Sequence, residues 1–292
     1  MKGTRNKLLD KQRYSLWLAA PGFLIFILIF VLPTLASFYY GFCNWNLREA
    51  EWTGLNNFKQ FFTMYNTKDA IWNTFRFTFW ESLIKVVGGL LLAVVLTSGI
   101  KSQNYLKIII FLPTLFGSVV VASAWSSIMH PDGILNQFLG LLGLEPVKWL
   151  TGHEWAMTSV IIVEVWKGIG TALILYIGGL SAIPKIYYEA AAIDGVTPVQ
   201  QFFSITLPLM VPTINSVLTL CMISGLRNYD LIYSLTGGGP GFETEVLGST
   251  IYKLFASSSY GIATAGYMII FVLACAIVLP INHWVGKRTE EL

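Results

Sequence analysis

Apolar stretches of membrane-spanning length recur six times along the chain, with shorter polar segments between them. Because about 20 helical residues cross the hydrocarbon core of a bilayer, each stretch predicts a transmembrane helix. The apolar runs are continuous and do not alternate with polar positions, which favours helices over a membrane β-barrel. The predicted spans are residues 16–40, 73–99, 106–128, 156–180, 209–235 and 261–285.

The expected fold is therefore an all-α membrane protein with six transmembrane helices, forming a single domain over residues 1–292. Composition supports this class, because only 12% of residues are charged and 54% are hydrophobic, whereas soluble domains average about 25% charged residues. The first apolar stretch exceeds the ~7–15 residues of a signal sequence and is expected to be a retained helix. The nucleotide-binding pattern GxxxxGK[ST] does not occur.

Lysine and arginine residues predict the orientation, because cytoplasmic loops carry more of them than external loops. The predicted orientation places both termini and the loop 181–208 in the cytoplasm, and Cys43 outside, within reach of an impermeant thiol reagent. Arg76 lies at the external border. The predicted cytoplasmic set is Lys2, Arg5, Lys7, Lys11, Arg13, Lys101, Lys107, Lys185, Lys287 and Arg288, and the external set is Arg48, Lys59, Lys68, Lys148 and Lys253.

The segment 181–208 has the pattern of two short helices joined by a turn. Gly195 permits a backbone turn that a residue with a Cβ resists, and Thr197-Pro198 suits the cap and first position of a second helix. This second helix is expected to end at Pro208 and Pro212, where the next span begins. It would carry the apolar residues Phe202, Phe203, Ile205 and Leu207. An ordinary amphipathic loop is the alternative interpretation.

The spacing of Glu189-Ala190-Ala191, Asp194-Gly195 and Leu207-Pro208 resembles the EAA loop of permease subunits in binding-protein-dependent ABC importers. Further segments extend the resemblance over nearly the whole chain, and the combination is similar to first-type permeases of the carbohydrate-uptake branch, the maltose and glycerol-phosphate type. These segments are LAAP at 18–21, GLNNF at 54–58, LP at 112–113, GLSAIP at 179–184 and LTGGGP at 235–240.

The resemblance implies a type I importer permease fold in a prokaryotic cell membrane, with no enzymatic activity of its own. It implies transport of a sugar or oligosaccharide delivered by an extracellular binding protein. It also implies a second, unlike permease and two ATPase copies, which would hold ATP and Mg while this chain holds no cofactor. The residues expected to contact the ATPase are Glu189, Ala190, Ala191, Asp194, Gly195, Phe202, Phe203, Leu207 and Pro208.

Polar residues at membrane depth are functional candidates, because charges are costly there. Glu164, Gly168 and Thr171 recur at i, i+4 and i+7 and so share one helix face. Relatives of the maltose type line their sugar site with the corresponding stretches. The predicted substrate path comprises Glu164, Trp166, Lys167, Gly168, Thr171, Cys221, Ser224, Gly225 and Asn228, with Tyr229 as a second aromatic candidate.

Three alternatives remain open for these polar residues. The small ones are common helix-packing contacts. Glu164 with Lys167, and Glu81 with Lys85, are spaced to form ion pairs within the bundle. A proton-coupled secondary carrier that uses Glu164 or Glu81 is the competing function. Catalytic and metal sites are not expected, because the histidines are scattered and Cys43, Cys221 and Cys275 have no CxxC spacing.

Overall fold

The computed structural model describes the backbone of residues 19–290 and the side chains of residues 19–285. Residues 16–18 of the first predicted span lie outside this range. So do five basic residues that were predicted to face the cytoplasm, Lys2, Arg5, Lys7, Lys11 and Arg13, and the side chains of Lys287 and Arg288.

The described chain is almost entirely helical. Its first half contains α1 (Ala20–Phe26), the π-helical turn η2 (Ile27–Val31), α2 (Leu32–Tyr40), β1 (Cys43–Trp45), β2 (Ala50–Trp52), α3 (Asn56–Thr63), α4 (Thr67–Thr97), α5 (Gln103–Phe111), the 3₁₀ turn η3 (Leu112–Leu115), α6 (Ser118–Ile128) and α7 (Ile134–Leu141). Its second half contains α8 (Ala156–Ala182), α9 (Ile186–Ile193), α10 (Pro198–Gln201), the π-helical turn η4 (Phe202–Thr206), α11 (Leu207–Arg227), α12 (Asp230–Thr236), α13 (Leu247–Ala256) and α14 (Tyr260–Glu290).

Five continuous helical stretches in the described part of the chain are long and apolar enough to cross a membrane, and a bent pair of helices makes up to six spans. An all-helical membrane architecture is therefore confirmed, with one short β-hairpin added to it. The five stretches are Ala20–Tyr40, Thr67–Thr97, Ala156–Ala182, Pro198–Arg227 and Tyr260–Val285.

The third predicted span, 106–128, is not one continuous helix. It consists of the stretch Gln103–Leu115 and the helix α6, and the chain bends by 104° between them. Pro113 lies in the 3₁₀ turn between them, and Gly117 takes an extended conformation with ψ 147°. Proline removes a backbone donor, and an extended residue cannot continue a helix, so the two together account for the bend.

The fifth span begins and ends earlier than predicted. A continuous helix runs from Pro198 to Arg227, and the chain then becomes extended at Asn228, with ψ 128°, before α12. The expectation that Pro208 and Pro212 separate the loop helix from the span is wrong. The π-helical turn η4 directly precedes α11, and Pro208 lies in the first turn of α11, where proline is tolerated.

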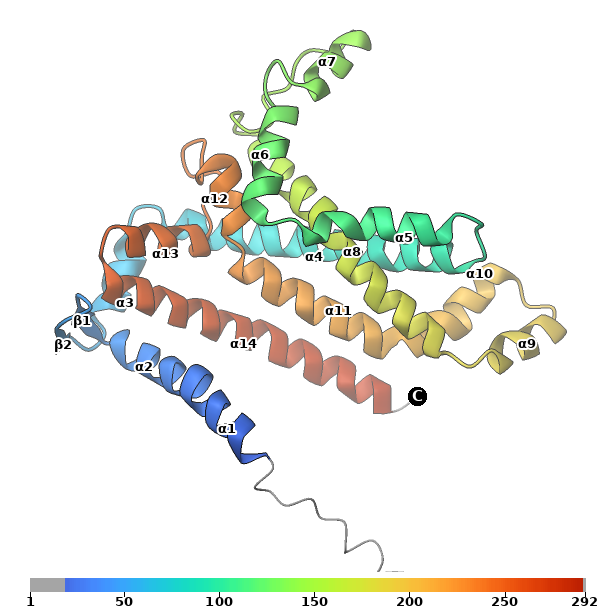
Figure 1. Cartoon of the computed structure of the whole chain (residues 1–292), viewed down its shortest axis with the longest axis horizontal. Coiled ribbons are helices and arrows are strands. Elements are labelled where there is room, and N and C mark those ends of the chain that lie inside the picture. Colours follow the sequence, from blue (N-terminus) through green and yellow to red (C-terminus); the bar gives the residue numbers. More distant parts are fainter. Residues whose placement is uncertain (1–18, 291–292) are drawn as a thin grey trace, which may run out of the picture.

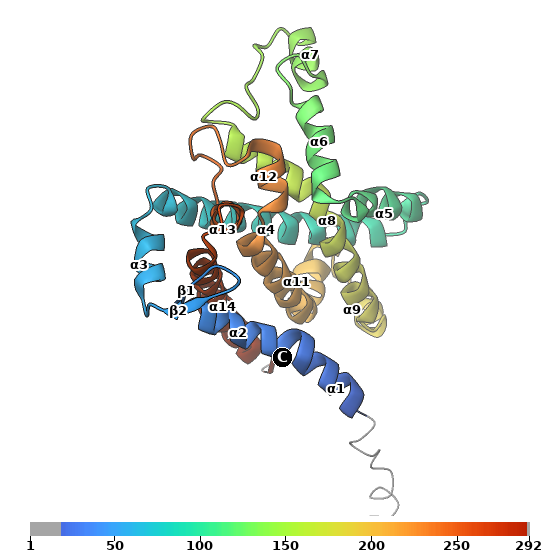
Figure 2. The same cartoon turned by 60° about the vertical axis from the view of Figure 1, so that its left-hand side comes forward.

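Helices α4, α8 and α11 form the centre of the bundle (Figure 1). Residues of all three, including Leu90, Leu173 and Met210, share one buried apolar cluster. α14 packs on α11, and α2 packs on α14 at the edge of the bundle (Figure 2). The first span has none of its apolar window buried in this chain, so its apolar side chains are available to lipid or to another subunit.

The two ends of the bundle carry different structures. The hairpin β1–β2, in which Cys43 pairs with Trp52, lies with α3 and α13 at one end, and α9 and α10 lie at the other (Figure 1). The Cys43 side chain has 0% relative exposure. The expectation that an impermeant thiol reagent reaches Cys43 is therefore contradicted, because the hairpin packs this residue inward.

Close contact between α4 and α8 depends on Gly89. A Cβ at this position would lie 2.8 Å from Cβ of Ala172. We expect Gly89→Ala to lower the apparent melting temperature of the purified protein, since overpacking costs about 1–3 kcal/mol. Gly178→Ala is the matched control in α8, because nothing lies within 4 Å of its added Cβ. Equal melting temperatures for the two variants in a fluorescence melt would contradict the packing.

Candidate functional site: a charged cluster and polar cavities in the bundle

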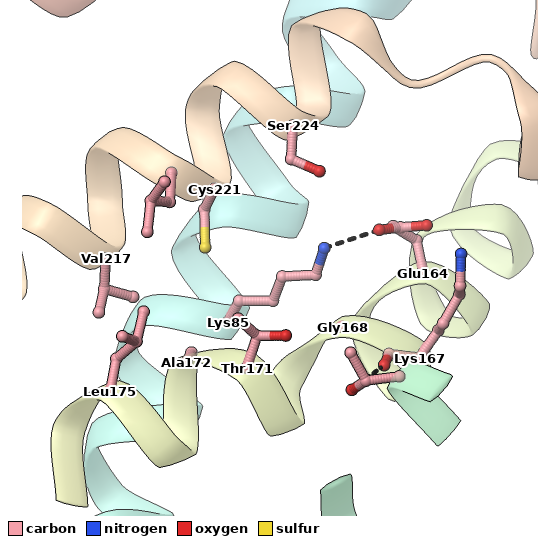
Figure 3. A pocket seen from close by; sticks show the side chains of 12 residues that line it. Lys85, Glu164, Lys167, Gly168, Thr171, Ala172, Leu175, Val217, Cys221 and Ser224 are labelled. Carbon is pink, nitrogen blue, oxygen red and sulfur yellow. Dashed lines mark hydrogen bonds and ion pairs between the residues drawn. The ribbon is translucent and has the colours of Figure 1, made fainter. Parts of the chain in front are cut away.

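A lysine bridges two carboxylates at the centre of the bundle. Nζ of Lys85 lies 2.5 Å from Oε2 of Glu81, one turn earlier on α4. The same Nζ donates a hydrogen bond of 2.8 Å to Oε1 of Glu164 on α8 (Figure 3). All three residues are buried. The cluster thus joins two membrane-spanning helices by a charge-assisted bond, which is roughly twice as strong as a neutral one.

Two glycines create the space for this cluster. A Cβ at Gly168 would lie 2.7 Å from Nζ of Lys85, and a Cβ at Gly225 would lie 2.6 Å from Oε1 of Glu81. The absence of side chains there lets Lys85 extend from α4 toward α8 and lets α11 pack against Glu81. Gly225 was predicted to line the substrate path, and the structure instead places it in the contact between α4 and α11.

A cavity of about 220 Å³ lies beside the cluster (Figure 3). Its polar wall comes from α4, α8, α11 and Thr114 of the turn η3, and its remaining wall is apolar. Six of the predicted path residues line it, namely Glu164, Lys167, Gly168, Thr171, Cys221 and Ser224. The i, i+4, i+7 face predicted for α8 therefore does meet the predicted face of α11.

A second cavity, of about 530 Å³, lies toward the C-terminal end of α11. It shares Glu164, Lys167, Leu220 and Ser224 with the first cavity, so these four residues separate the two spaces. Two further residues that the sequence predicted for the substrate path, Asn228 and Tyr229, line this second cavity. The sequence prediction did not include four further lining residues, Ser118, Ile223, Arg227 and Asp230.

Trp166 is not among the residues that line either cavity. Its ring packs edge-on against Trp125, with ring centroids 5.4 Å apart. The helical spacing of α8 accounts for this, because Trp166 lies two residues from Glu164 and therefore on a different face.

The ion pairing differs in part from the sequence expectation. The Glu81–Lys85 pair is confirmed, but Glu164 pairs with Lys85 and not with Lys167. Nζ of Lys167 instead donates a 2.7 Å hydrogen bond to Oγ of Ser118, beyond the bend between α5 and α6. Oγ1 of Thr114 donates to the backbone oxygen of Lys167 at 2.9 Å. The bent segment therefore docks on α8 at the cavity wall, which no pattern in the sequence indicated.

The segment 181–208 forms a tight elbow at the opposite end of α11. Gly195, with φ +69°, follows α9 and makes the turn that the sequence predicted. The Thr197 side chain accepts from the backbone N–H of Gln200, while the Gln200 side chain accepts from that of Thr197, and Pro198 begins the helix. The Tyr188 hydroxyl lies 2.9 Å from the Thr206 hydroxyl and ties α9 to the π-helical turn.

The predicted contact residues of the elbow face in two directions. Phe202 and Leu207 pack against the buried cluster of the bundle, and Ala191 is buried. Phe203 is exposed, as are Glu189, Ala190, Asp194 and Gly195, while Pro208 is half-buried. A groove of about 460 Å³ includes Ala190, Ala191 and Asp194 in its lining. The sequence prediction did not include Ile193 and Val199, two exposed apolar residues of the elbow.

The described residues contain no group of three or more histidine, cysteine, aspartate or glutamate side chains that could hold a metal ion. His153 lies 3.5 Å from Glu243 across two exposed loops. The polar groups that line the two cavities are hydroxyl, ammonium and carboxylate groups. These groups can form hydrogen bonds with a hydroxyl-rich solute.

Comparisons with known proteins identify the family. Residues 85–291 match the model of the binding-protein-dependent transport system inner membrane component. The trehalose/maltose transport system permease protein MalF of Thermococcus litoralis is 29% identical, over 94% of this chain and 96% of its own length. The multiple sugar-binding transport system permease protein MsmF of Streptococcus mutans is 30% identical, over 98% of this chain and 99% of its own length.

A solved structure agrees in fold with this chain. It is that of a bacterial ABC transporter involved in the import of the acidic polysaccharide alginate. The TM-score is 0.83 at 28% identity, and the match covers 96% of this chain and 99% of the other. The helical bundle therefore has the type I importer permease fold. The chain belongs to the family of inner membrane components of binding-protein-dependent transport systems, as a permease subunit of an ABC importer.

Proposed function

We propose that this chain moves a sugar or oligosaccharide inward across the cell membrane as the permease subunit of an ABC importer. Relatives of 29% and 30% identity serve trehalose/maltose and multiple-sugar systems. Family membership favours this function over a proton-coupled secondary carrier. Glu164 and Glu81, the proton sites that such a carrier would need, are both bonded to Lys85.

The observation that carries the proposal is the continuous helix from Pro198 to Arg227. Its first residues form the elbow, and Cys221 and Ser224 near its other end line the solute cavity. Phe203 and Cys221 are roughly 27 Å apart along this helix at about 1.5 Å per residue. A displacement of the elbow is therefore transmitted to the cavity by one rigid element.

The proposed assembly contains a second, unlike permease, two ATPase copies and an extracellular binding protein. ATP and Mg would bind to the ATPase copies, and this chain would hold no cofactor. The elbow would dock on the ATPase through Phe203, Ile193 and Val199, whose exposed apolar side chains suit burial in a groove. A solved relative in complex with an alginate-pentasaccharide-bound periplasmic protein supports the binding-protein partner.

The solute path is tested by two cavity variants and one control. Glu164→Gln removes a charged acceptor, so we expect the half-saturating sugar concentration for uptake to rise about tenfold or more, since a hydrogen bond to a charged group contributes about 1.5–3 kcal/mol. Ser224 lines both cavities, so Ser224→Ala should weaken uptake, to a smaller extent than Glu164→Gln. Ser216→Ala on the same helix is its control, because that hydroxyl bonds Pro212 of its own helix. Unchanged uptake in both cavity variants would remove these residues from the path.

Coupling is tested at the turn of the elbow. Gly195→Asp adds a side chain and a negative charge at φ +69°, a backbone conformation that L residues rarely adopt, and should displace α9 from α10. We expect the assembled complex to lose most of its ATPase stimulation by the binding protein, because stimulation requires both sites to share one conformational equilibrium. Gly143→Asp is the matched control, since Gly143 also has a positive φ, of +74°, and open space around it but follows α7. Normal stimulation of the Gly195→Asp complex would exclude the elbow as the coupling element.

Orientation is tested with single cysteines in a background in which the three native cysteines are replaced. Asp132→Cys should react with an impermeant maleimide added to intact cells, because the Asp132 side chain is 95% exposed and follows α6. Thr197→Cys in the exposed cap of α10 should react only after the membrane is opened. Labelling in the reverse order would invert the proposed topology.

A further inference from the structure

Four charged side chains gather at the boundary between the two cavities. Glu164 and Lys167 line both cavities, and Lys85 lines the smaller one. Glu81 lines neither and has 0% relative exposure. Glu81 therefore carries a charge next to the solute path without being able to contact a solute.

With Glu81 included, the charges of the wall cancel. Lys85 and Lys167 supply two positive charges, and Glu81 and Glu164 supply two negative charges. The larger cavity adds Arg227 and Asp230, one of each sign. Without the carboxylate of Glu81, the same wall would carry one net positive charge and would attract an anionic solute, because charges inside a bundle are poorly screened.

We propose that Glu81 is a positioning residue that acts on the solute path through Lys85. It holds Lys85 in place and cancels the one positive charge that would otherwise remain on the cavity wall. The path therefore selects uncharged saccharides over saccharides that carry a carboxylate. This inference rests on the proposed function and names the substrate class of the same site. The fold itself does not decide this class, because the solved relative of similar fold takes part in the import of an acidic polysaccharide.

The local packing fits this role. Oε2 of Glu81 lies 2.5 Å from Nζ of Lys85, and Oε1 accepts a 3.3 Å hydrogen bond from Ser82. A Cβ at Gly225 would lie 2.6 Å from Oε1, so α11 covers the carboxylate on the side of the helix contact. Glu81→Gln keeps the shape of this side chain and removes its charge, while one oxygen remains to face Lys85.

The test compares saccharides that differ only in charge. The assembled complex in lipid nanodiscs, without binding protein, is titrated with maltose, trehalose and maltotriose, and with the uronate of each made by oxidising one primary alcohol. Saturation-transfer NMR measures the ratio of the two affinities in each pair. We expect the unmodified complex to prefer the neutral sugar. Glu81→Gln should shift the ratio toward the uronate by about thirtyfold, as expected for two charges about 8 Å apart at an effective dielectric constant of about 20.

The double variant Glu81→Gln/Lys85→Gln separates charge from packing, because a glutamine amide at position 85 is uncharged and still offers a donor to Glu164. It restores a neutral wall, so the ratio should return to the preference of the unmodified complex, whereas damage to packing would persist or increase. An unchanged ratio in Glu81→Gln, or a shift that remains in the double variant, overturns the inference. Preference of the unmodified complex for uronates overturns the inference and leaves sugar transport intact. If no saccharide of either class binds, the inference is overturned, and sugar uptake in the presence of the binding protein then decides the proposed function separately.

Discussion

The bond between Lys85 and its two carboxylates is the constraint around which the bundle is arranged. A charged residue at the centre of a bilayer costs about 2.5–3.5 kcal/mol on insertion scales, and removing one partner of a buried pair costs about 3–5 kcal/mol. Three such groups can be accommodated only if α4 and α8 bring them within bonding distance. Gly168 and Gly225 follow from this requirement, because a side chain at either position would occupy the space of the cluster. The polar cavity then lies beside the cluster, where the helices cannot close completely.

The backbone of α11 imposes the second constraint. Inside a membrane every backbone N–H and C=O needs a partner within the chain, so a proline in a span usually marks a bend. Pro208 and Pro212 do not interrupt this helix, in which a π-helical turn at Phe202–Thr206 comes just before Pro208. Pro113 has no such turn and lies at the bend of 104° between α5 and α6. The same residue type thus produces a rigid connection to the elbow in one place and a break beside the cavity in another.

The sequence predicted those features that depend on local chemistry. Gly195 needs a positive φ, and Thr197-Pro198 favours the start of a helix, so the turn and the cap of the elbow could be predicted from these residues alone. The shared face of Glu164, Gly168 and Thr171 follows from helical spacing. The partner of Glu164 could not be predicted, because Lys167 is near it in sequence and Lys85 is near it only after α4 and α8 pack. The position of Trp166 could have been predicted, because two residues of helical spacing from Glu164 put it on a different face of α8, where it packs against Trp125.

The two sets of contacts around α4 differ in strength, and this difference decides which helix can move. α4 and α8 are joined by an ion pair across the bundle and by the close approach of Gly89 to Ala172. α11 approaches the same cluster through Gly225 and through the cavity-lining residues Cys221 and Ser224, none of which carries a full charge. Sliding of α11 along α4 therefore exchanges van der Waals contacts of about 0.1–0.2 kcal/mol per atom pair, whereas separation of α4 from α8 would leave a carboxylate buried without its partner. In the proposed coupling, motion that begins at the elbow would accordingly change the α11 wall of the cavity while the charged wall stays fixed.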